Sequence, residues 1–368
     1  MRRFSFVITS LTLVLTMCIG TVFAGNEQRA GQAGAPELLI NPWARSSGMG
    51  GANTASVQGL EAIYLNVAGT AFINKTDLMF SHNQYLVGTG IGIYAFGFAQ
   101  KVGEAGVLSL GVMSLDAGKI DITTVNVPEG GLGTFHPQFT TISASYAREF
   151  SNSIYGGATI KIVSGGISDL KASGVAIDAG IQYVTGLGVN KLGDKNRDNL
   201  RFGITMKNVG PEMKYTGDGM SFRAESPAGI IMTNEYRSAT YELPSLIKIG
   251  FAYDLKLAPK VDSTNDEITC DHILSAVANF TSNSFTKDQF HFGLEYKFKS
   301  ILMLRGGYIY EAGITGEEKD TWYTGPTGGV SLEFPLSKVT GTRMSIDYSY
   351  RATTNFDGIH AIGIRVSL

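Results

Sequence analysis

The stretch at residues 289–299, QFHFGLEYKFK, alternates apolar and polar residues along its whole length. Successive side chains of an extended strand point to opposite sides, so one face of this stretch is aromatic and oily and the other is polar. A strand of a soluble sandwich also alternates, but its apolar face is usually aliphatic. About ten residues is the length that crosses a bilayer at a tilt. The stretch therefore predicts a membrane-spanning strand, and the same pattern recurs along the chain.

The first 24 residues are typical of a secretory signal peptide. Arg2 and Arg3 precede an apolar run over residues 6–19, and small residues lead to a predicted cleavage site after Ala24. A lipoprotein signal would use Cys18, but Met17 stands where such a site needs a small residue. We therefore expect an exported protein.

The composition favours one class of exported protein. Charged residues make up 17% of the chain, below the roughly 25% of soluble proteins, and there are 46 glycines. No run of about 18 apolar residues follows the signal peptide, which excludes spanning helices, and Cys270 is then the only cysteine. Basic and acidic residues nearly balance, at 30 and 32, with no block of like charge that would suggest nucleic acid. These properties predict an outer-membrane β-barrel.

Residues 25–75 show no strand alternation. Residues 25–36 are small and polar and are predicted to be a mobile leader. Residues 40–73 contain a glycine-rich turn at 48–51 and an apolar stretch at 60–72 with approximate helical spacing. We interpret them as a plug inside the barrel; the alternative is a periplasmic N-terminal extension. The candidate plug residues are Trp43, Arg45, Gly48, Met49, Gly50 and Asn66.

Strand candidates then follow one another to the C-terminus, so the barrel is assigned to residues 76–368. We expect strands at 76–86, 90–101, 104–114, 139–150, 154–164, 172–185, 199–208, 245–254, 270–281, 289–298, 301–310, 324–334, 342–350 and 359–368. Fourteen is an even number, as bacterial single-chain barrels require. The predicted fold is therefore all-β, a 14-stranded antiparallel transmembrane β-barrel with an N-terminal plug-like segment.

The predicted connections give an independent check on this strand count. If the first strand runs outward, the inner connections are mostly short, such as residues 102–103 and 299–300. The longest connections, at 115–138, 209–244 and 311–323, all fall on the outer side. Outer-membrane barrels have short inner turns and longer outer loops. The order of connections therefore supports the predicted topology.

The polar faces of the strands define the predicted lumen. The lumen is expected to collect Arg201, Lys207, Lys248, His291, Glu295, Lys297, Arg305, Arg343, Asp347 and Arg365. This set is mixed in charge. Its members either pair across the lumen or line a selectivity filter, and pairing is the simpler interpretation.

Residues that carry enzyme chemistry do not form a recognisable set. The five histidines lack metal-ligand spacing, and Cys270, which Asp271 and His272 follow, has no partner thiol. No serine sits in a nucleophile elbow, and residues 48–51 are not a phosphate loop because no strand precedes them. We therefore predict no catalytic activity, no cofactor and no metal site.

Five segments occur in an order that is familiar. They are residues 41–50 (NPWARSSGMG), 141–150, 173–178, 206–211 and 243–246. Together they resemble the PorV/PorQ family, FadL-like outer-membrane proteins of the type IX secretion system. Where that family usually has Trp-Asn-Pro-Ala in the plug, this chain has LNVA at 65–68. The resemblance implies a fourteen-stranded barrel without catalysis in the outer membrane of a Bacteroidota-type bacterium, which receives exported cargo from a translocon or anchors the secretion machinery.

Two functional hypotheses follow. As an accessory component of type IX secretion, the barrel would bind the translocon or secreted cargo through the outer loop at 209–244, unless that loop is only a solvated lid. The candidate contact residues in this loop are Tyr215, Met220, Phe222, Met232, Tyr236 and Tyr241. As a FadL-like channel, the alternative, it would pass hydrophobic small molecules, with glycine-rich strands that kink to open a lateral exit. Outer-membrane lipid is a partner in either case.

Overall fold

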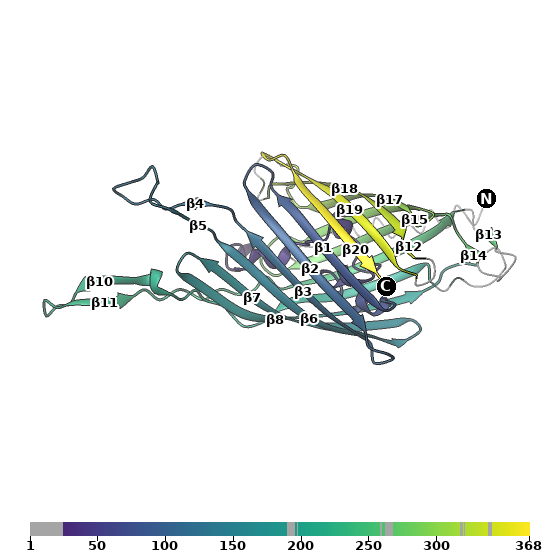
Figure 1. The fold of residues 1–368 in the computed structure, drawn as a ribbon, viewed down its shortest axis with the longest axis horizontal. Helices are drawn as coiled ribbons and strands as arrows, with labels where there is room; N and C mark the ends of the chain where they lie inside the picture. The colour runs from purple at the N-terminus through teal and green to yellow at the C-terminus, as the bar shows by residue number, and fades with distance from the viewer. Residues whose placement is uncertain are drawn as a thin grey trace.

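The computed structural model describes residues 25–189, 196, 198–257, 260–261, 268–316, 319, 321–337 and 341–368. The predicted signal peptide lies outside these residues. Within them, fourteen antiparallel strands close into a barrel in sequence order (Figure 1). They are β1 (Thr76–Tyr85), β2 (Ile91–Lys101), β3 (Val107–Asp116), β6 (Gln138–Ser151), β7 (Ile154–Ile167), β8 (Leu170–Thr185), β9 (Leu200–Val209), β12 (Leu246–Leu257), β15 (His272–Asn283), β16 (Gln289–Phe298), β17 (Leu302–Glu311), β18 (Tyr323–Pro335), β19 (Arg343–Thr353) and β20 (Ile359–Ser367).

The predicted fold class is confirmed, and each of the fourteen predicted strands is present with its ends within three residues of the expected positions. The alternation of side chains explains this agreement. On β2, for example, Tyr94, Phe96 and Phe98 are exposed on the outside of the barrel, whereas Ile93 and Ala95 are buried inside. Apolar side chains face outward on strand after strand, as lipid requires, and the polar faces turn to the lumen.

The barrel closes where the first strand meets the last. Phe80 of β1 lies opposite Phe96 of β2 on one side and opposite Ile364 of β20 on the other. No strand edge of the barrel is therefore left unpaired along this seam. In a bilayer this closure satisfies backbone groups that lipid cannot hydrogen-bond.

The two ends of the barrel differ. The end that carries residues 117–137 and 210–245 is called the long-loop end, and the opposite end is called the short-turn end. From the long-loop end project two small hairpins, β4 (Ile120–Asp121) with β5 (Thr134–Phe135) and β10 (Ser221–Glu225) with β11 (Ile231–Glu235) (Figure 1). A short 3₁₀ helix, η5 (Asp218–Met220), precedes β10, and a third hairpin, β13 (Lys260–Val261) with β14 (Ile268–Thr269), extends from the short-turn end.

One seam of the barrel wall is irregular near the long-loop end. The β17–β18 ladder stops at the pair Tyr308 and Pro326, and the β18–β19 register shifts between Tyr323 and Thr327. Gly325 has a φ of 104°, and a Cβ there would lie 2.7 Å from the ring of Tyr308. Proline supplies no N–H to a ladder and glycine accepts this backbone conformation, so the sequence Gly-Pro accounts for the interruption.

The segment before β1 fills the lumen with short helical turns. They are η1 (Glu27–Arg29), η2 (Pro36–Leu39), α2 (Ala44–Ser47), η3 (Leu60–Tyr64) and η4 (Val67–Phe72). The apolar stretch at 60–72 thus forms two 3₁₀ helices, and its side chains join Trp43 in the interior of the barrel. Among the described residues, no helix is long and apolar enough to cross a membrane.

Glycines in the wall let this plug approach the strands closely. Gly203 of β9 and Gly250 of β12 are paired, and a Cβ on Gly203 would lie 2.6 Å from the carbonyl oxygen of Thr54. A Cβ on Gly250 would lie 2.9 Å from the amide nitrogen of Ala55. The plug backbone therefore rests directly on the backbone of the wall at this point.

We predict that Gly203→Ala lowers the free energy of unfolding by about 1–3 kcal/mol, because the new methyl group overpacks the contact with the plug. Urea titration of the purified barrel in detergent measures this. Gly306→Ala is the matched control, since nothing lies within 4 Å of a Cβ there. Equal stability of the two variants would contradict the expected contact.

Candidate functional site

Polar contacts fix the plug to the wall on several sides. The Asn66 side-chain amide donates to the carbonyl oxygens of Thr54 at 3.1 Å and of Ile181 at 3.0 Å. Lys207 donates to the carbonyl of Tyr64 at 2.7 Å, and Ser81 donates to the carbonyl of Pro42 at 2.7 Å. These bonds are buried and satisfy backbone groups of the irregular plug. The plug is therefore held as part of the structure, and it divides the lumen.

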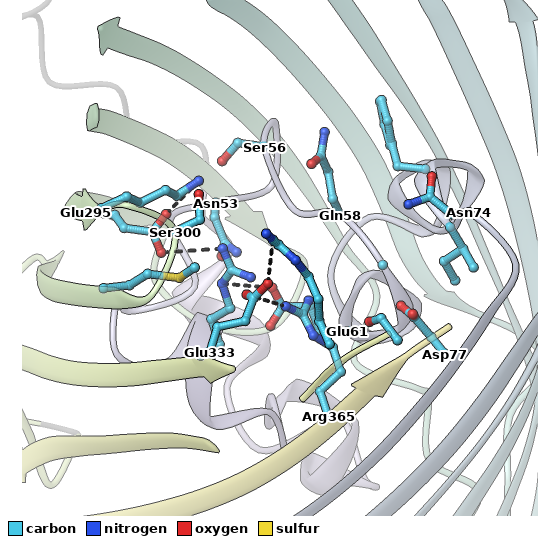
Figure 2. Close-up of a pocket in the computed structure, with 18 of the residues that line it drawn as sticks. Asn53, Ser56, Gln58, Glu61, Asn74, Asp77, Glu295, Ser300, Glu333 and Arg365 are labelled. Carbon is cyan, nitrogen blue, oxygen red and sulfur yellow. Dashed lines mark hydrogen bonds and ion pairs between the residues drawn. The ribbon is translucent and has the colours of Figure 1, made fainter. Parts of the chain in front are cut away.

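The cavity at the short-turn end has a volume of about 550 Å³ and a strongly polar wall (Figure 2). Glu333 accepts from Arg343 at 2.7 Å and from Arg365 at 3.4 Å. Arg201 pairs with Asp254 at 3.3 Å. Most charges of this cavity thus neutralise one another, and the arrangement favours water over an apolar ligand.

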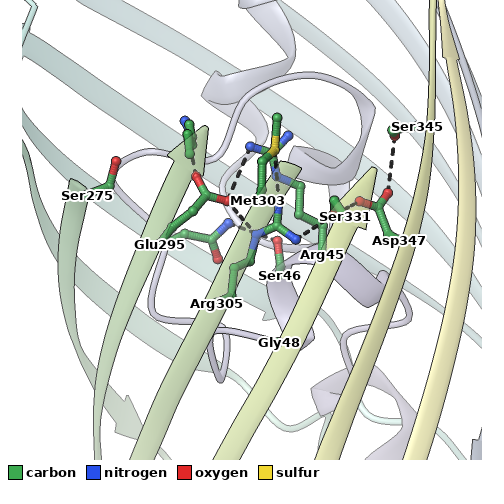
Figure 3. A network of polar contacts seen from close by, with 12 residues as sticks. Arg45, Ser46, Gly48, Ser275, Glu295, Met303, Arg305, Ser331, Ser345 and Asp347 are labelled. Carbon is green, nitrogen blue, oxygen red and sulfur yellow. Dashed lines mark hydrogen bonds and ion pairs between the residues drawn. The ribbon is translucent and has the colours of Figure 1, made fainter. Parts of the chain in front are cut away.

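A buried network connects the plug to this wall (Figure 3). Glu295 is its centre: it accepts from Arg305 and lies 3.1 Å from Lys297 and 3.6 Å from Arg45 of the plug. Arg305 also donates to Ser331 at 2.6 Å. Burial of charges is costly unless each finds partners, and here the carboxylate of Glu295 is surrounded by three cations.

The cavity at the long-loop end is different in character. It has a volume of about 780 Å³, and large apolar side chains from the plug and from strands around the barrel form much of its wall. They include Leu65, Leu115, Phe139, Leu246, Ile309 and Ile359. The wall also adjoins the irregular seam through Trp322 and Tyr323. A mainly apolar cavity with a few polar groups is typical of a site for small hydrophobic ligands.

Two cations, Lys248 and Arg351, face this apolar cavity. Within the described part of the chain, neither Lys248 nor Arg351 pairs with an acidic side chain. The guanidinium of Arg351 lies 3.3 Å from the ring centroid of Tyr323, whose hydroxyl is 2.5 Å from that of Tyr85. The Nε atom of Arg351 is buried and has no hydrogen-bond acceptor. An anionic group in the cavity would supply the missing acceptors.

Four other side chains that can carry charge line the same cavity, namely Glu37, Lys287, His291 and Glu311. His291 is occupied, because its Nδ1 atom lies 2.7 Å from the carbonyl of Gly50 and its Nε2 atom 3.1 Å from the hydroxyl of Thr281. Glu37 lies in η2, directly after the leader, and burial raises its pKa above the usual range of a glutamate. A raised pKa favours the neutral acid. Lys287 and Glu311 contribute one charge of each sign, so Lys248 and Arg351 leave the wall of the cavity with an excess of positive charge.

The structure separates the predicted lumen residues into three groups. Arg201, Glu295, Lys297, Arg343 and Arg365 line the short-turn cavity, and Lys248 and His291 line the long-loop cavity. Lys207, Arg305 and Asp347 are buried in contacts among the plug and the wall. The predicted plug residues Trp43, Arg45, Gly48, Met49, Gly50 and Asn66 all lie inside the barrel.

The predicted contact residues of the loop at 209–244 divide in two. Tyr215 and Tyr241 form a ring pair 5.8 Å apart at the base of the loop. Phe222 and Tyr236 stack at 4.2 Å on the projecting hairpin, where Met232 is exposed, and Met220 accepts a backbone hydrogen bond from Tyr236. The second group lies on the projecting hairpin, where a large partner can reach it.

Arg351 was not singled out in the sequence analysis. The signal was present, since residues 343, 345, 347, 349 and 351 follow one alternating face of β19. The predicted strand stopped at residue 350, one position before Arg351, whereas β19 ends at Thr353. Among the described residues, no group of three or more His, Cys, Asp or Glu side chains could hold a metal ion.

Comparisons with known proteins agree on the fold only. No protein-family model matches the chain. No curated protein matches it. The toluene transporter TodX of Pseudomonas putida is similar in structure, with a TM-score of 0.52 at 13% identity over 89% of this chain and 97% of that one. At such identity the likeness shows the fold alone.

Two further solved structures cover the same 89% of this chain at 12% identity. The CymD monoaromatic hydrocarbon channel is covered to 97% with a TM-score of 0.47. A FadL homologue of Pseudomonas aeruginosa is covered to 96% with a TM-score of 0.48. The closed fourteen-strand barrel itself supports an outer-membrane location. The narrower PorV/PorQ resemblance finds no counterpart in these comparisons.

We predict that Arg305→Met destabilises the barrel by about 3 kcal/mol, because it removes the buried guanidinium that donates to both Glu295 and Ser331. Arg343→Met is the control, since the Arg343 side chain is 53% exposed and an exposed pair contributes about 0–1 kcal/mol. Urea unfolding in detergent compares the two. An equal loss of stability in Arg343→Met would show that burial of the network does not cause the effect.

Proposed function

We propose that this protein is an outer-membrane channel that takes up hydrophobic small molecules at its long-loop end. The observation that carries the proposal is the apolar cavity of about 780 Å³ above the plug. TodX, which shares the fold, is described as a toluene transporter. The long-loop end would face the outside, because outer-membrane barrels place their longer loops there.

Lys248 and Arg351 narrow the class of ligand that the cavity is expected to bind. Toluene and other hydrocarbons offer no acceptor to Lys248 or Arg351. A molecule with an apolar body and one carboxylate or similar anionic end would fill the apolar wall and satisfy both cations. We therefore propose anionic amphiphiles as preferred ligands.

The fixed plug and the interrupted wall both favour a lateral exit from the barrel. The plug is held by buried hydrogen bonds such as those of Asn66 and Lys207, so it blocks a direct path to the short-turn cavity. The β17–β18 ladder ends at Tyr308 and Pro326, beside the cavity residues Ile309 and Tyr323. Passage through this interrupted seam would deliver an apolar molecule into the bilayer.

We predict that Lys248→Met and Arg351→Met each weaken binding of a fatty acid such as oleate by about 2 kcal/mol, or about thirtyfold in Kd, because each removes a charge-assisted hydrogen bond. Binding of toluene should stay unchanged in both variants. Tryptophan fluorescence is a suitable readout because Trp322 lines the cavity. Lys297→Met, in the short-turn cavity, is the control.

Failure of the folded parent protein to bind either oleate or toluene would sink the proposed function. Equal losses for oleate and toluene in the two variants would keep the channel but remove the anionic preference.

A second candidate function rests on the β10–β11 hairpin. It extends far from the barrel, and Ile231 and Tyr236 on it are 68% and 64% exposed (Figure 1). Such exposed apolar residues on a polar rim are suited to protein contacts. Together with the PorV/PorQ resemblance, this favours an accessory role in type IX secretion, with translocon or cargo as partner. Export through the predicted signal peptide and a Bacteroidota-type host belong to the same proposal.

We predict that deletion of residues 217–237 leaves the barrel folded, because the hairpin adds no strand to it, but abolishes capture of any protein partner. Affinity purification from the native outer membrane followed by mass spectrometry checks this. Deletion of residues 122–133, which connect β4 and β5, controls for the loss of a projecting loop. Unchanged co-purification would rule out the hairpin as the contact site.

A further inference from the structure

The leader follows the rim of the long-loop end. Gly25 packs against the backbone of Asp288, where a Cβ would lie 2.7 Å from the amide nitrogen. The guanidinium of Arg29 lies 4.3 Å from the ring centroid of Phe285 and forms an ion pair with Glu242. Both side chains of this ion pair are partly exposed, so it contributes little to stability.

The leader then meets the base of the loop between β9 and β12. Ala33 and Glu242 form an isolated parallel bridge, and the Gly34 amide donates to the Glu242 carbonyl at 3.0 Å. The backbone of Gly34 packs directly against the ring of Tyr241, because a Cβ on Gly34 would lie 2.1 Å from a ring atom. On its other side Tyr241 contacts Tyr215. The ring of Tyr241 is thus shared between the leader and the loop.

The leader forms part of the wall of the long-loop cavity through Ala30 and Pro36, and the wall continues along the residues that follow it, Glu37, Leu39 and Ile40. The plug is fixed by buried side-chain bonds, but residues 25–34 of the leader are held by exposed side chains and by single backbone bonds. Exposed, sparsely bonded segments are the first to open in a folded protein. Residues 25–34 of the leader can therefore open more readily than the plug.

We propose that the leader is a movable cover on the long-loop cavity and that its contact with Tyr241 and Glu242 is the latch that keeps it closed. The inference rests on the proposed function, since it concerns access to the same cavity. Release of the latch lets a ligand enter without any displacement of the plug. A cover of this kind shields the apolar wall from water while the cavity is empty.

A disulfide that locks the latch tests the proposal. Ala33→Cys with Glu242→Cys joins the bridged pair, in a Cys270→Ser background whose one other cysteine, Cys18, lies in the predicted signal peptide. Oxidation should slow oleate binding about tenfold or more, and reduction should restore it, because only the open state admits ligand. Arg223→Cys with Thr233→Cys joins a facing pair on the β10–β11 hairpin and should leave the rate unchanged. Equal rates for the oxidised and reduced latch variant would overturn the cover.

A second measurement is independent of ligand binding. Ser349 is buried in the cavity wall, so Ser349→Cys in the Cys270→Ser background reports access to the cavity through its rate of reaction with a water-soluble maleimide. Tyr241→Ala should raise that rate about threefold or more by weakening the latch. Tyr236→Ala, which removes the same ring from the hairpin, should not.

An unchanged labelling rate in folded Tyr241→Ala would overturn the cover. A raised labelling rate in a parent that binds neither oleate nor toluene would instead support the cover and refute the proposed function.

Discussion

Backbone hydrogen bonding in lipid is the constraint on which the rest of this structure depends. A bilayer offers no partners to peptide groups, so the wall must be a closed sheet whose strands satisfy one another. The pairing of β1 with β20 completes that sheet. Closure creates an interior that has to be filled, and the segment before β1 fills it. The polar inward faces of the strands are then available to bind the plug and to line the two cavities.

The two cavities differ because different groups meet in them. Near the short-turn end, Arg305 and Arg45 gather around the buried carboxylate of Glu295 and compensate its charge. Near the long-loop end, apolar side chains such as Leu65 and Ile309 predominate, and within the described residues neither Lys248 nor Arg351 forms an ion pair with an acidic side chain. Compensated charge stabilises the plug, whereas uncompensated charge beside an apolar wall is suited to a ligand. The plug is therefore a boundary between a structural half and a binding half of the lumen.

The fold could be predicted because it follows from a local pattern. Residue alternation of period two fixed the strands, and Lys248 and His291 were placed in the lumen for the same reason. The arrangement of the binding half could not be predicted. The leader is small and polar and was expected to be mobile, yet Gly34 packs on Tyr241, more than two hundred residues away in sequence. Gly325 and Pro326 signal an irregularity, but only the register of three strands shows that it adjoins the cavity. Contacts between distant segments determine these features, and a local pattern does not contain them.

The join between β1 and β20 also constrains how the chain assembles. Its partners, such as Leu78 and Val366, are almost as far apart in sequence as any two residues of the barrel, so this pairing forms late by the usual relation between sequence separation and folding rate. The plug directly precedes β1 and is enclosed on all sides once the ring is complete. We therefore expect the plug to be seated on β9 and β12, where Gly203 and Gly250 receive it, while the sheet is still open. Insertion and folding of this protein would then be a single ordered process in which the plug takes its place in the lumen before the wall closes around it.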